Sequence, residues 1–179
     1  MDANSLIHNE LENEASAVLA ALFQQHRTAL CAYLSCLVND WETARDLTQE
    51  TFLRAFRARR QLLQVDNRRA WLYRIATNLA IDANRRQRRW QWLPWHGIDA
   101  AGDFTAQQAD LNLAVAEALA ALPVAYRAPL LLYSGYGFSV REVAEALDLG
   151  HEAVKTRLYR ARKMFRRAYG EEDHDPPSS

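Results

Sequence analysis

The residues from Ser139 to Arg167 combine helix caps, small apolar residues and cations at spacings that suit binding of a polyanion. Ser139 and Glu142 form the S-x-x-E pattern of a capping box, which predicts the start of a short helix. Gly150 then marks a tight turn, and a longer basic stretch begins at His151. Two helices joined by a short turn, with the second helix basic, are typical of a helix-turn-helix that binds DNA.

The residues of these two predicted helices divide into an inner and an outer set. Six residues at helical spacing predict the contact between the helices: Val143, Ala144, Leu147, Val154, Leu158 and Ala161. The polar residues on the other side are expected to face the major groove: Lys155, Thr156, Arg157 and Arg160. A solvated basic helix in an ordinary bundle is the alternative. The capping box and the one-sided charge favour DNA binding.

A second basic stretch lies between Arg54 and Arg89, where eleven arginines accompany two acidic residues, Asp66 and Asp82. Guanidinium groups pair with phosphate oxygens through two parallel hydrogen bonds, so the run at residues 85–89 suits phosphate binding. A charged helix end stabilised by the helix dipole is the competing interpretation of the same run.

Two aromatic residues, Trp71 and Tyr73, lie within the second basic stretch. Both side chains are candidates for stacking on unpaired bases. Trp71 also shares helical spacing with Ile75 and Leu79, which favours a core position with an exposed edge.

Asp46, Gln49 and Glu50 form a polar patch at helical spacing in a basic neighbourhood. Such a patch suits docking of a basic protein partner, whereas paired carboxylates are also used in acid–base chemistry. No histidine lies within helical reach of either carboxylate, and the chain has no glycine-rich phosphate loop. The five histidines show no metal-ligand spacing with each other or with the cysteines. We therefore expect no enzymatic activity, no cofactor and no metal.

Composition and charge narrow the class of protein. Of the 179 residues, 49% are hydrophobic and 25% are charged, which is enough apolar content for a folded core. The formal net charge is zero, but 18 of the 22 basic residues lie in the two basic stretches. That local excess indicates two surfaces for nucleic acid, which the balanced total conceals.

The sequence shows neither a membrane span nor a secretory signal. No stretch approaches the roughly 20 apolar residues that a span requires, and the N-terminus lacks a basic start followed by an apolar run. Cys31 and Cys36 lie five residues apart in a predicted helix, which is poor geometry for a disulfide. We expect free thiols and a cytoplasmic protein.

Helical periodicity predicts the elements that must position these residues. Six glycines and five prolines are few for this length, which favours an all-α fold. We expect N-terminal helices over residues 15–38 and 41–63, and a third from about residue 68 to residue 89. After a linker, a second helical unit starts near residue 111, turns at 122–123 and 135–137, and ends near residue 169.

Several of these motifs, taken in order, resemble one family. The segments DLTQETFLRA at 46–55 and AWLYRIATNLAID at 70–82 resemble region 2 of the extracytoplasmic-function (group IV) sigma factors of the sigma-70 family. The segments ALP at 121–123, SVREVAEAL at 139–147 and VKTRLYRAR at 154–162 resemble their region 4. Each motif alone is modest, but the ordered set is specific and covers most of residues 18–168.

The resemblance implies a transcription initiation factor that binds core RNA polymerase, recognises and melts the minus-ten promoter element and reads the minus-thirty-five element. The implied fold is all-α, with two small helical domains joined by a flexible linker. The expected parts are a disordered N-terminus (1–13), region 2 (14–90), the linker (91–110), region 4 (111–170) and a disordered acidic tail (171–179).

The resemblance also implies roles for particular residues. Asp46, Gln49 and Glu50 match positions that contact the clamp helices of the largest polymerase subunit, and the flap region of polymerase is a further expected partner. Asn78 matches a position that lines the pocket for a flipped minus-ten base, and the Leu62–Arg69 loop matches the specificity loop beside it. The full expected minus-ten set is Leu62, Arg68, Arg69, Arg74, Asn78, Arg85 and Arg86. Leu62 stands where aromatic residues are common in the family.

In region 4, Lys155, Thr156, Arg157 and Arg160 are the expected minus-thirty-five contacts. The resemblance further implies an anti-sigma factor as a partner. It assigns no role to the aromatic run of Trp90, Trp92 and Trp95. A stand-alone helix-turn-helix regulator that does not bind polymerase is the alternative function, because it needs the same basic helix.

Overall fold

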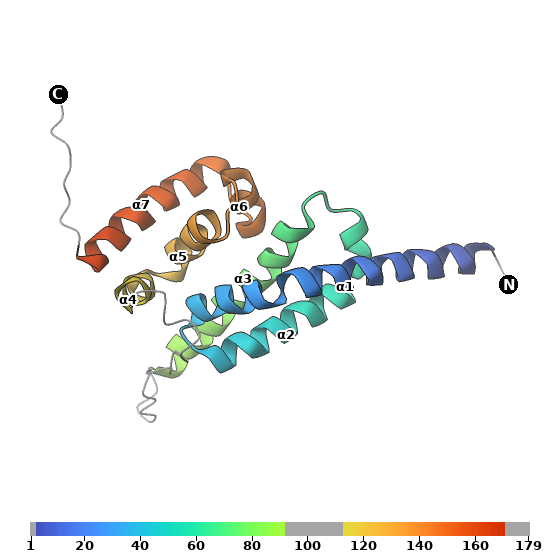
Figure 1. Cartoon of the computed structure of the whole chain (residues 1–179), viewed down its shortest axis with the longest axis horizontal. Coiled ribbons are helices and arrows are strands. Elements are labelled where there is room, and N and C mark those ends of the chain that lie inside the picture. The colour runs from blue at the N-terminus through green and yellow to red at the C-terminus, as the bar shows by residue number, and fades with distance from the viewer. Residues whose placement is uncertain (1–2, 92–112, 171–179) are drawn as a thin grey trace. The chain divides into compact units, whose positions relative to one another are not determined.

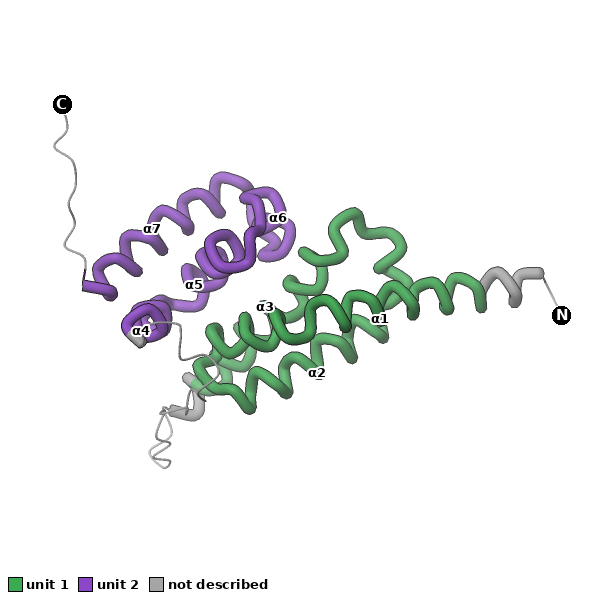
Figure 2. Tube along the Cα trace, viewed as in Figure 1, with its two compact units in different colours: residues 1–96 green, residues 97–179 purple. Residues whose placement is uncertain are grey.

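The computed structural model describes residues 3–91 and 113–170, and all the regular structure in these ranges is helical. The chain divides into two compact units, residues 1–96 and 97–179 (Figure 2). This division agrees with the two helical domains expected from the sequence. Each unit is described by itself below.

Unit 1 is a bundle of three long helices with one short helical turn (Figure 1). The helices are α1 (Ala3–Val38), α2 (Trp41–Arg57) and α3 (Arg68–Gln91), and the 3-10 turn η1 (Arg59–Leu63) follows α2. Each long helix packs against the other two, and η1 packs against α1. Their buried apolar faces form the core, which includes Leu30, Leu34, Leu37, Ala44, Leu47, Ala55, Leu72 and Ala76.

The turn between α1 and α2 follows from two polar residues. Asn39 adopts the left-handed conformation with a φ of 56°, which asparagine tolerates at the end of a helix. Asp40 then caps α2, and its carboxylate accepts a hydrogen bond of 2.7 Å from the Thr43 amide. The predicted break at these two residues and the cap at Asp40 are confirmed.

A buried polar contact joins α1 to α3. The Tyr33 hydroxyl lies 2.7 Å from the Thr77 hydroxyl, and the Tyr33 and Tyr73 rings pack with centroids 5.2 Å apart. Tyr73 is fully buried, and this burial raises its pKa to about 12. The stacking role considered for Tyr73 is therefore wrong, because its ring fills the core. Trp71 is half-buried, as its spacing predicted.

The first helix is longer than expected. It begins at Ala3, so the expectation that residues 1–13 are disordered does not hold for residues 3–13. The physical reason is a contact remote in sequence: Glu12 pairs with Arg59 and Arg60 of η1, and Ala15 one turn later is buried. Local periodicity did not reveal this extension.

The second helix is shorter than expected and ends at Arg57 rather than near residue 63. The backbone tightens into η1, where the Gln61 amide donates to the Ala58 carbonyl at 2.9 Å. This turn directs Leu62 into the core, where it is fully buried. Leu62 is therefore removed from the expected minus-ten contacts, because a leucine with no exposed surface cannot touch a base.

The described part of unit 2, residues 113–170, contains five helical elements, and the last of them is the longest. These are α4 (Leu113–Ala121), α5 (Val124–Leu130), the π-helical turn η3 (Leu131–Gly135), α6 (Val140–Leu147) and α7 (His151–Tyr169). α7 packs against α4, α5 and α6. One core cluster joins Leu122, Leu130 and Ala161 with partly buried Leu119, Tyr126, Met164 and Phe165. The predicted turns at 122–123 and 135–137 are confirmed.

A buried cation closes the end of α4. Arg127, on α5, is 5% exposed, and its guanidinium donates to the Ala120 carbonyl at 2.7 Å and to the Leu122 carbonyl at 2.8 and 3.1 Å. The last carbonyls of a helix lack partners within that helix, so Arg127 satisfies acceptors that burial would otherwise leave unpaired.

Two expected segments lie outside the described residues: most of the linker at 91–110, with Trp92 and Trp95, and the tail at 171–179. The side chain of Trp90 is likewise not described. Within 3–91 and 113–170, no helix has the length and apolar character needed to cross a membrane.

Replacement of Arg127 tests the cap on α4. Arg127→Met keeps the apolar part of the side chain but removes every guanidinium hydrogen bond. We expect a loss of about 2–3 kcal/mol in the free energy of unfolding of unit 2, because hydrogen bonds from charged donors are strong and the acceptors stay buried. Urea denaturation of the full chain, followed by circular dichroism, measures it.

Arg141→Met is the matched control. Arg141 forms an exposed pair with Glu145 on α6, and such pairs contribute only about 0.3–0.5 kcal/mol. Equal losses in the two variants would contradict the role given to Arg127.

Candidate protein and nucleic-acid interfaces

The start of α6 has the capping geometry that the sequence predicts. The Ser139 hydroxyl accepts from the Glu142 amide at 3.2 Å, and the Glu142 carboxylate accepts from the Ser139 amide at 2.8 Å. At the other end, Asp148 adopts a left-handed conformation, and the Leu149 amide donates to the Ala144 carbonyl at 3.0 Å. These bonds fix the direction in which the chain enters α7 at His151.

The predicted inner residues hold α6 against α7. Val143, Ala144, Val154, Leu158 and Ala161 are buried. Leu147 is half-buried. The helix-turn-helix is therefore present in unit 2 with the register expected from the sequence.

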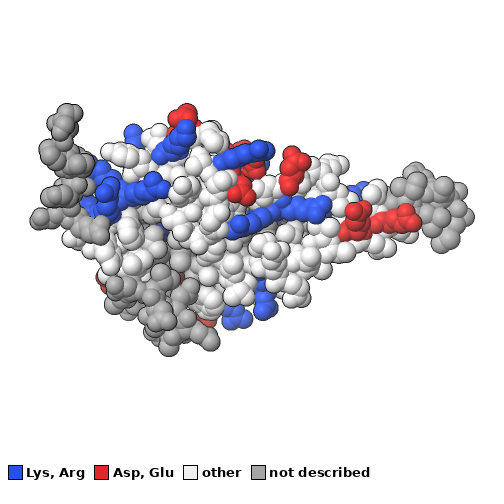
Figure 3. All heavy atoms as spheres, turned by 45° about the horizontal axis from the view of Figure 1, so that its top comes forward, with Lys and Arg blue, Asp and Glu red and all other residues white. Residues whose placement is uncertain are grey.

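The outward face of α7 carries three of the four predicted contacts. Lys155, Thr156 and Arg160 are exposed, whereas Arg157 is half-buried beside the buried Leu158. Lys155 forms an exposed ion pair with Glu152 at 2.8 Å. Figure 3 shows Lys and Arg side chains along the part of the surface formed by α7.

One exposed residue of α7, Tyr159, was not among the contacts predicted from the sequence. Tyr159 is 67% exposed, the largest value among the exposed large hydrophobic residues that the described chain contains. It lies four residues after Lys155 and therefore on the same side of the helix. Apolar side chains also contact bases, so a search that included them beside the charged residues would have singled out Tyr159.

α3 presents a polar face with Asn78 at its centre. Asn78 is exposed, and Arg74 and Arg85 lie four residues before and seven after it, so all three share one side of the helix. Arg85 and Arg86 are exposed, and Arg85 lies 3.9 Å from Asp82. Asn84, also on α3, is half-buried and donates to the Leu37 and Ala80 carbonyls, so this asparagine, unlike Asn78, is tied to the backbone.

The two arginines at the start of α3 make different contacts. The Arg68 Nε donates to the Leu62 carbonyl at 3.0 Å, which joins the start of α3 to the end of η1. The guanidinium of Arg69 is half-buried and lies 5.9 Å from the centre of the Tyr73 ring. Arg68 therefore holds the segment in place as well as adding positive charge, whereas the contact of Arg69 with Tyr73 lies within α3.

The polar patch lies on α2. Asp46 and Gln49 are exposed and Glu50 is half-buried. The Glu50 carboxylate accepts a hydrogen bond of 2.7 Å from Arg54 one turn later. Asp46 therefore presents its carboxylate to a partner more readily than Glu50, which already has a cation on its own helix.

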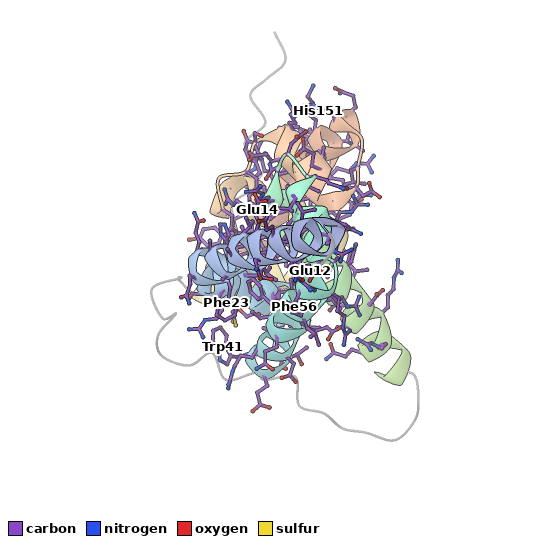
Figure 4. The ribbon with its side chains drawn as sticks, turned by 90° about the vertical axis from the view of Figure 1, so that its right-hand side faces the viewer. Glu12, Glu14, Phe23, Trp41, Phe56 and His151 are labelled. Atoms are coloured by element: carbon purple, nitrogen blue, oxygen red, sulfur yellow. The ribbon has the colours of Figure 1, made fainter. Side chains whose placement is uncertain are left out.

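A groove of about 510 Å³ adjoins this patch and was not anticipated. It lies between α1 and α2, with apolar walls from Phe23, Trp41 and Phe52 and with Arg27, Arg45 and Gln49 among its polar lining. The Phe23 and Phe52 rings meet edge to face at 4.8 Å. Figure 4 labels Phe23 and Trp41 on one side of unit 1. Gln49 belongs to both the groove and the polar patch.

The two units match two models of one family. Residues 22–90 match sigma-70 region 2, and residues 112–165 match sigma-70 region 4. A region 2 followed by a region 4 is the domain order of a sigma factor. The region 2 match in unit 1 also leaves the alternative function, a stand-alone helix-turn-helix regulator, without support.

Curated relatives place the chain within that family. It is 30% identical to the extracytoplasmic-function (ECF) RNA polymerase sigma factor SigM of Mycobacterium tuberculosis over 149 residues, with 83% of this chain and 76% of SigM covered. It is also 30% identical to RNA polymerase sigma factor SigZ of Bacillus subtilis, with 79% and 81% covered. The chain belongs to the ECF sigma factors of the sigma-70 family, which are transcription initiation factors that bind RNA polymerase.

Solved structures agree with this assignment. The sigma factor RpoE of Bartonella quintana, in complex with the anti-sigma factor NepR, aligns with a TM-score of 0.71 at 25% identity, covering 83% of this chain and 94% of that one. CnrH, in complex with the cytosolic domain of CnrY, aligns with a TM-score of 0.63 at 26% identity, covering 92% and 95%.

Proposed function

We propose that unit 1 docks on core RNA polymerase through the polar patch on α2, at the clamp helices of the largest subunit. The observation that carries this proposal is the exposure of Asp46 and Gln49 on α2. Carboxylates on a stable helix face suit a basic helical partner through charge-assisted hydrogen bonds. The adjoining apolar groove offers the same partner surface to bury. The flap region of polymerase is the proposed partner of unit 2.

The exposed face of α3 is the proposed minus-ten surface. Asn78 is placed to hydrogen-bond a base extruded from the duplex, with Arg74, Arg85 and Arg86 neutralising phosphates around it. Arg68 and Arg69 complete the set at the start of the helix. Leu62 is left out because it is buried.

α7 is the proposed reader of the minus-thirty-five element. Thr156 and Arg160 lie four residues apart and share a face, whereas Lys155 lies about 140° around the helix from Arg160. We assign Thr156 and Arg160 to base edges and Lys155 to a flanking phosphate. Arg157, half-buried beside them, contacts phosphate at the margin, and the exposed ring of Tyr159 adds an apolar contact on the Lys155 side.

The remaining assignments follow from the family. Residues 14–90 form the proposed polymerase-binding and promoter-melting domain, and residues 111–170 form the minus-thirty-five domain, with the linker at 91–110 between them. The protein works in the cytoplasm, where bacterial polymerase and promoters are found. Because structurally similar sigma factors form complexes with anti-sigma factors, an anti-sigma factor is a proposed partner of this chain as well.

Removal of the carboxylates on α2 tests the docking surface. Asp46→Ala combined with Glu50→Ala should weaken binding to core polymerase, by about 1.5–3 kcal/mol for each buried charge-assisted contact. Asp46→Ala alone should account for the larger share, because Glu50 is paired with Arg54. Titration of labelled protein against purified core polymerase gives the affinity. Glu14→Ala, which removes one exposed charge from α1, is the control and should keep the original affinity. Unchanged affinity in the folded double variant would show that the patch on α2 does not dock on polymerase.

Replacement of Asn78 separates melting from simple binding. Asn78→Ala should slow open-complex formation on duplex promoters more than on templates already unpaired over the minus-ten element. The reason is that a contact with the extruded base offsets part of the cost of unstacking it, a few kcal/mol. Stopped-flow fluorescence with both templates measures the two rates. Equal slowing on the two templates would show that Asn78 supports the fold instead.

Two substitutions on α7 test the division between base and phosphate contacts. Arg160→Ala should relax preference at one minus-thirty-five position at a cost of ~1–3 kcal/mol, whereas Lys155→Ala should weaken binding to all sequences and lower the salt slope by about one. Binding to a panel of minus-thirty-five variants at several salt concentrations distinguishes them. Exchanged phenotypes would reverse the roles, and no effect from either variant would exclude α7 as the reader.

A further inference from the structure

The N-terminal part of α1 holds η1 through one carboxylate. Glu12 accepts hydrogen bonds from Arg59 and from Arg60, whose Nε lies 2.8 Å and whose second amino group lies 2.6 Å from the same carboxylate oxygen. These partners are 47 and 48 residues away in sequence. A single glutamate therefore joins the first turns of the chain to the turn that follows α2.

The contact is more constrained than an ordinary surface ion pair. The Glu12 and Arg59 side chains are only 26% and 21% exposed. Arg59 also donates to the Phe56 carbonyl at 3.1 Å, and its guanidinium lies 4.4 Å from the centre of the Phe56 ring. Hydrogen bonding from Arg60, followed by that from Arg59, lowers the pKa of Glu12, so the carboxylate is ionised at neutral pH. The geometry leaves Arg59 little freedom.

The segment anchored in this way leads directly into α3. From η1 the chain passes through residues 64–67, and Asn67 caps α3 by accepting from the Ala70 amide at 2.9 Å. Arg68 ties the start of α3 back to the Leu62 carbonyl. The segment between α2 and α3 is therefore held by Glu12 at Arg59 and Arg60, and by Arg68 at the Leu62 carbonyl.

From these contacts we infer that Glu12 is a positioning residue for minus-ten recognition: it sets the orientation of η1 and thereby the shape of the loop at residues 64–67. The inference rests on the proposed role of α3 at the minus-ten element, and on the expectation from the family resemblance that the loop at residues 62–69 lies beside the flipped base. Glu12 itself touches no DNA in this mechanism. Its effect passes through Arg59 and Arg60 to the segment beside the bases.

The chain provides a matched control in Glu14. Glu12 and Glu14 lie two residues apart on α1, so their side chains point in nearly opposite directions. Figure 4 shows Glu12 on the side of α1 that faces Phe56 and Glu14 on the other side. Glu14 is exposed. Glu12→Gln and Glu14→Gln thus remove the same charge from the same helix, but only the first weakens the attachment of η1.

The experiment measures promoter preference with reconstituted holoenzyme. Open-complex formation is followed on a promoter panel that carries each single substitution in the minus-ten element. Glu12→Gln should reduce discrimination at one or two minus-ten positions by about five- to tenfold, a size typical of a displaced base contact. Glu14→Gln should keep the original preference, and discrimination in the minus-thirty-five element should be unchanged in both variants.

A second variant tests whether the effect passes through the ion pair. Arg60→Gln should shift the same minus-ten positions, and the Glu12→Gln/Arg60→Gln double variant should show no further shift, because the two residues act through one contact. Arg60→Gln also keeps the test decisive if Glu12→Gln fails to fold, which circular dichroism reports.

Three results would overturn the inference. Unchanged preference in folded Glu12→Gln would show that the pair only stabilises the fold. A uniform rise in DNA affinity with a steeper salt slope would show that Glu12 only screens the arginines. Additive shifts in the double variant would exclude a shared route. Asn78→Ala in the same assay separates failure of this inference from failure of the proposed minus-ten surface. If Asn78→Ala slows melting while Glu12→Gln keeps the original preference, the inference about Glu12 is wrong and the proposed minus-ten surface stands.

Discussion

The hydrogen bond between Tyr33 and Thr77 sets the register of α3, on which the proposed DNA surface of unit 1 depends. The Thr77 hydroxyl donates to the Tyr73 carbonyl, so it accepts from the Tyr33 hydroxyl. Both residues are buried, so replacing either one would remove a hydrogen bond between two polar groups in the core, which costs stability. With Thr77 fixed inward, the next residue is rotated by about 100° towards solvent. The exposure of Asn78, and of Arg74 one turn before it, follows from this polar contact.

In unit 2, the register of the proposed DNA-binding helix, α7, does not depend on a buried hydrogen bond between side chains. The register of α7 comes from a purely apolar stripe, in which Val154, Leu158 and Ala161 are buried, and from the backbone geometry of the turn before it. The left-handed Asp148 and the capping box at Ser139 determine where α7 starts. The two proposed DNA surfaces are thus supported independently, one by a buried hydrogen bond and the other by caps and packing.

Features encoded by neighbouring residues could be predicted from the sequence. The cap at Asp40, the capping box at Ser139 and the inner face of α7 all depend on residues within a few positions of each other, and all are present. The inward turn of Leu62 could not be predicted, because it requires the switch to 3-10 geometry after α2 and burial against α1. The extension of α1 and the partners of Glu12 were missed for the same reason: they depend on residues almost fifty positions away.

Arg127 has a consequence for how unit 2 folds. Its guanidinium resides on α5, but the carbonyls that it satisfies end α4, so the last turn of α4 is incomplete until α5 has formed and docked. Formation of these two helices is therefore coupled, and neither is an independent step in folding. A proteolytic nick between residues 122 and 124 would separate the donor from its acceptors without removing a single core side chain. A folded fragment of unit 2 should therefore need this short connection intact, because it carries the link between Arg127 and the carbonyls that it satisfies.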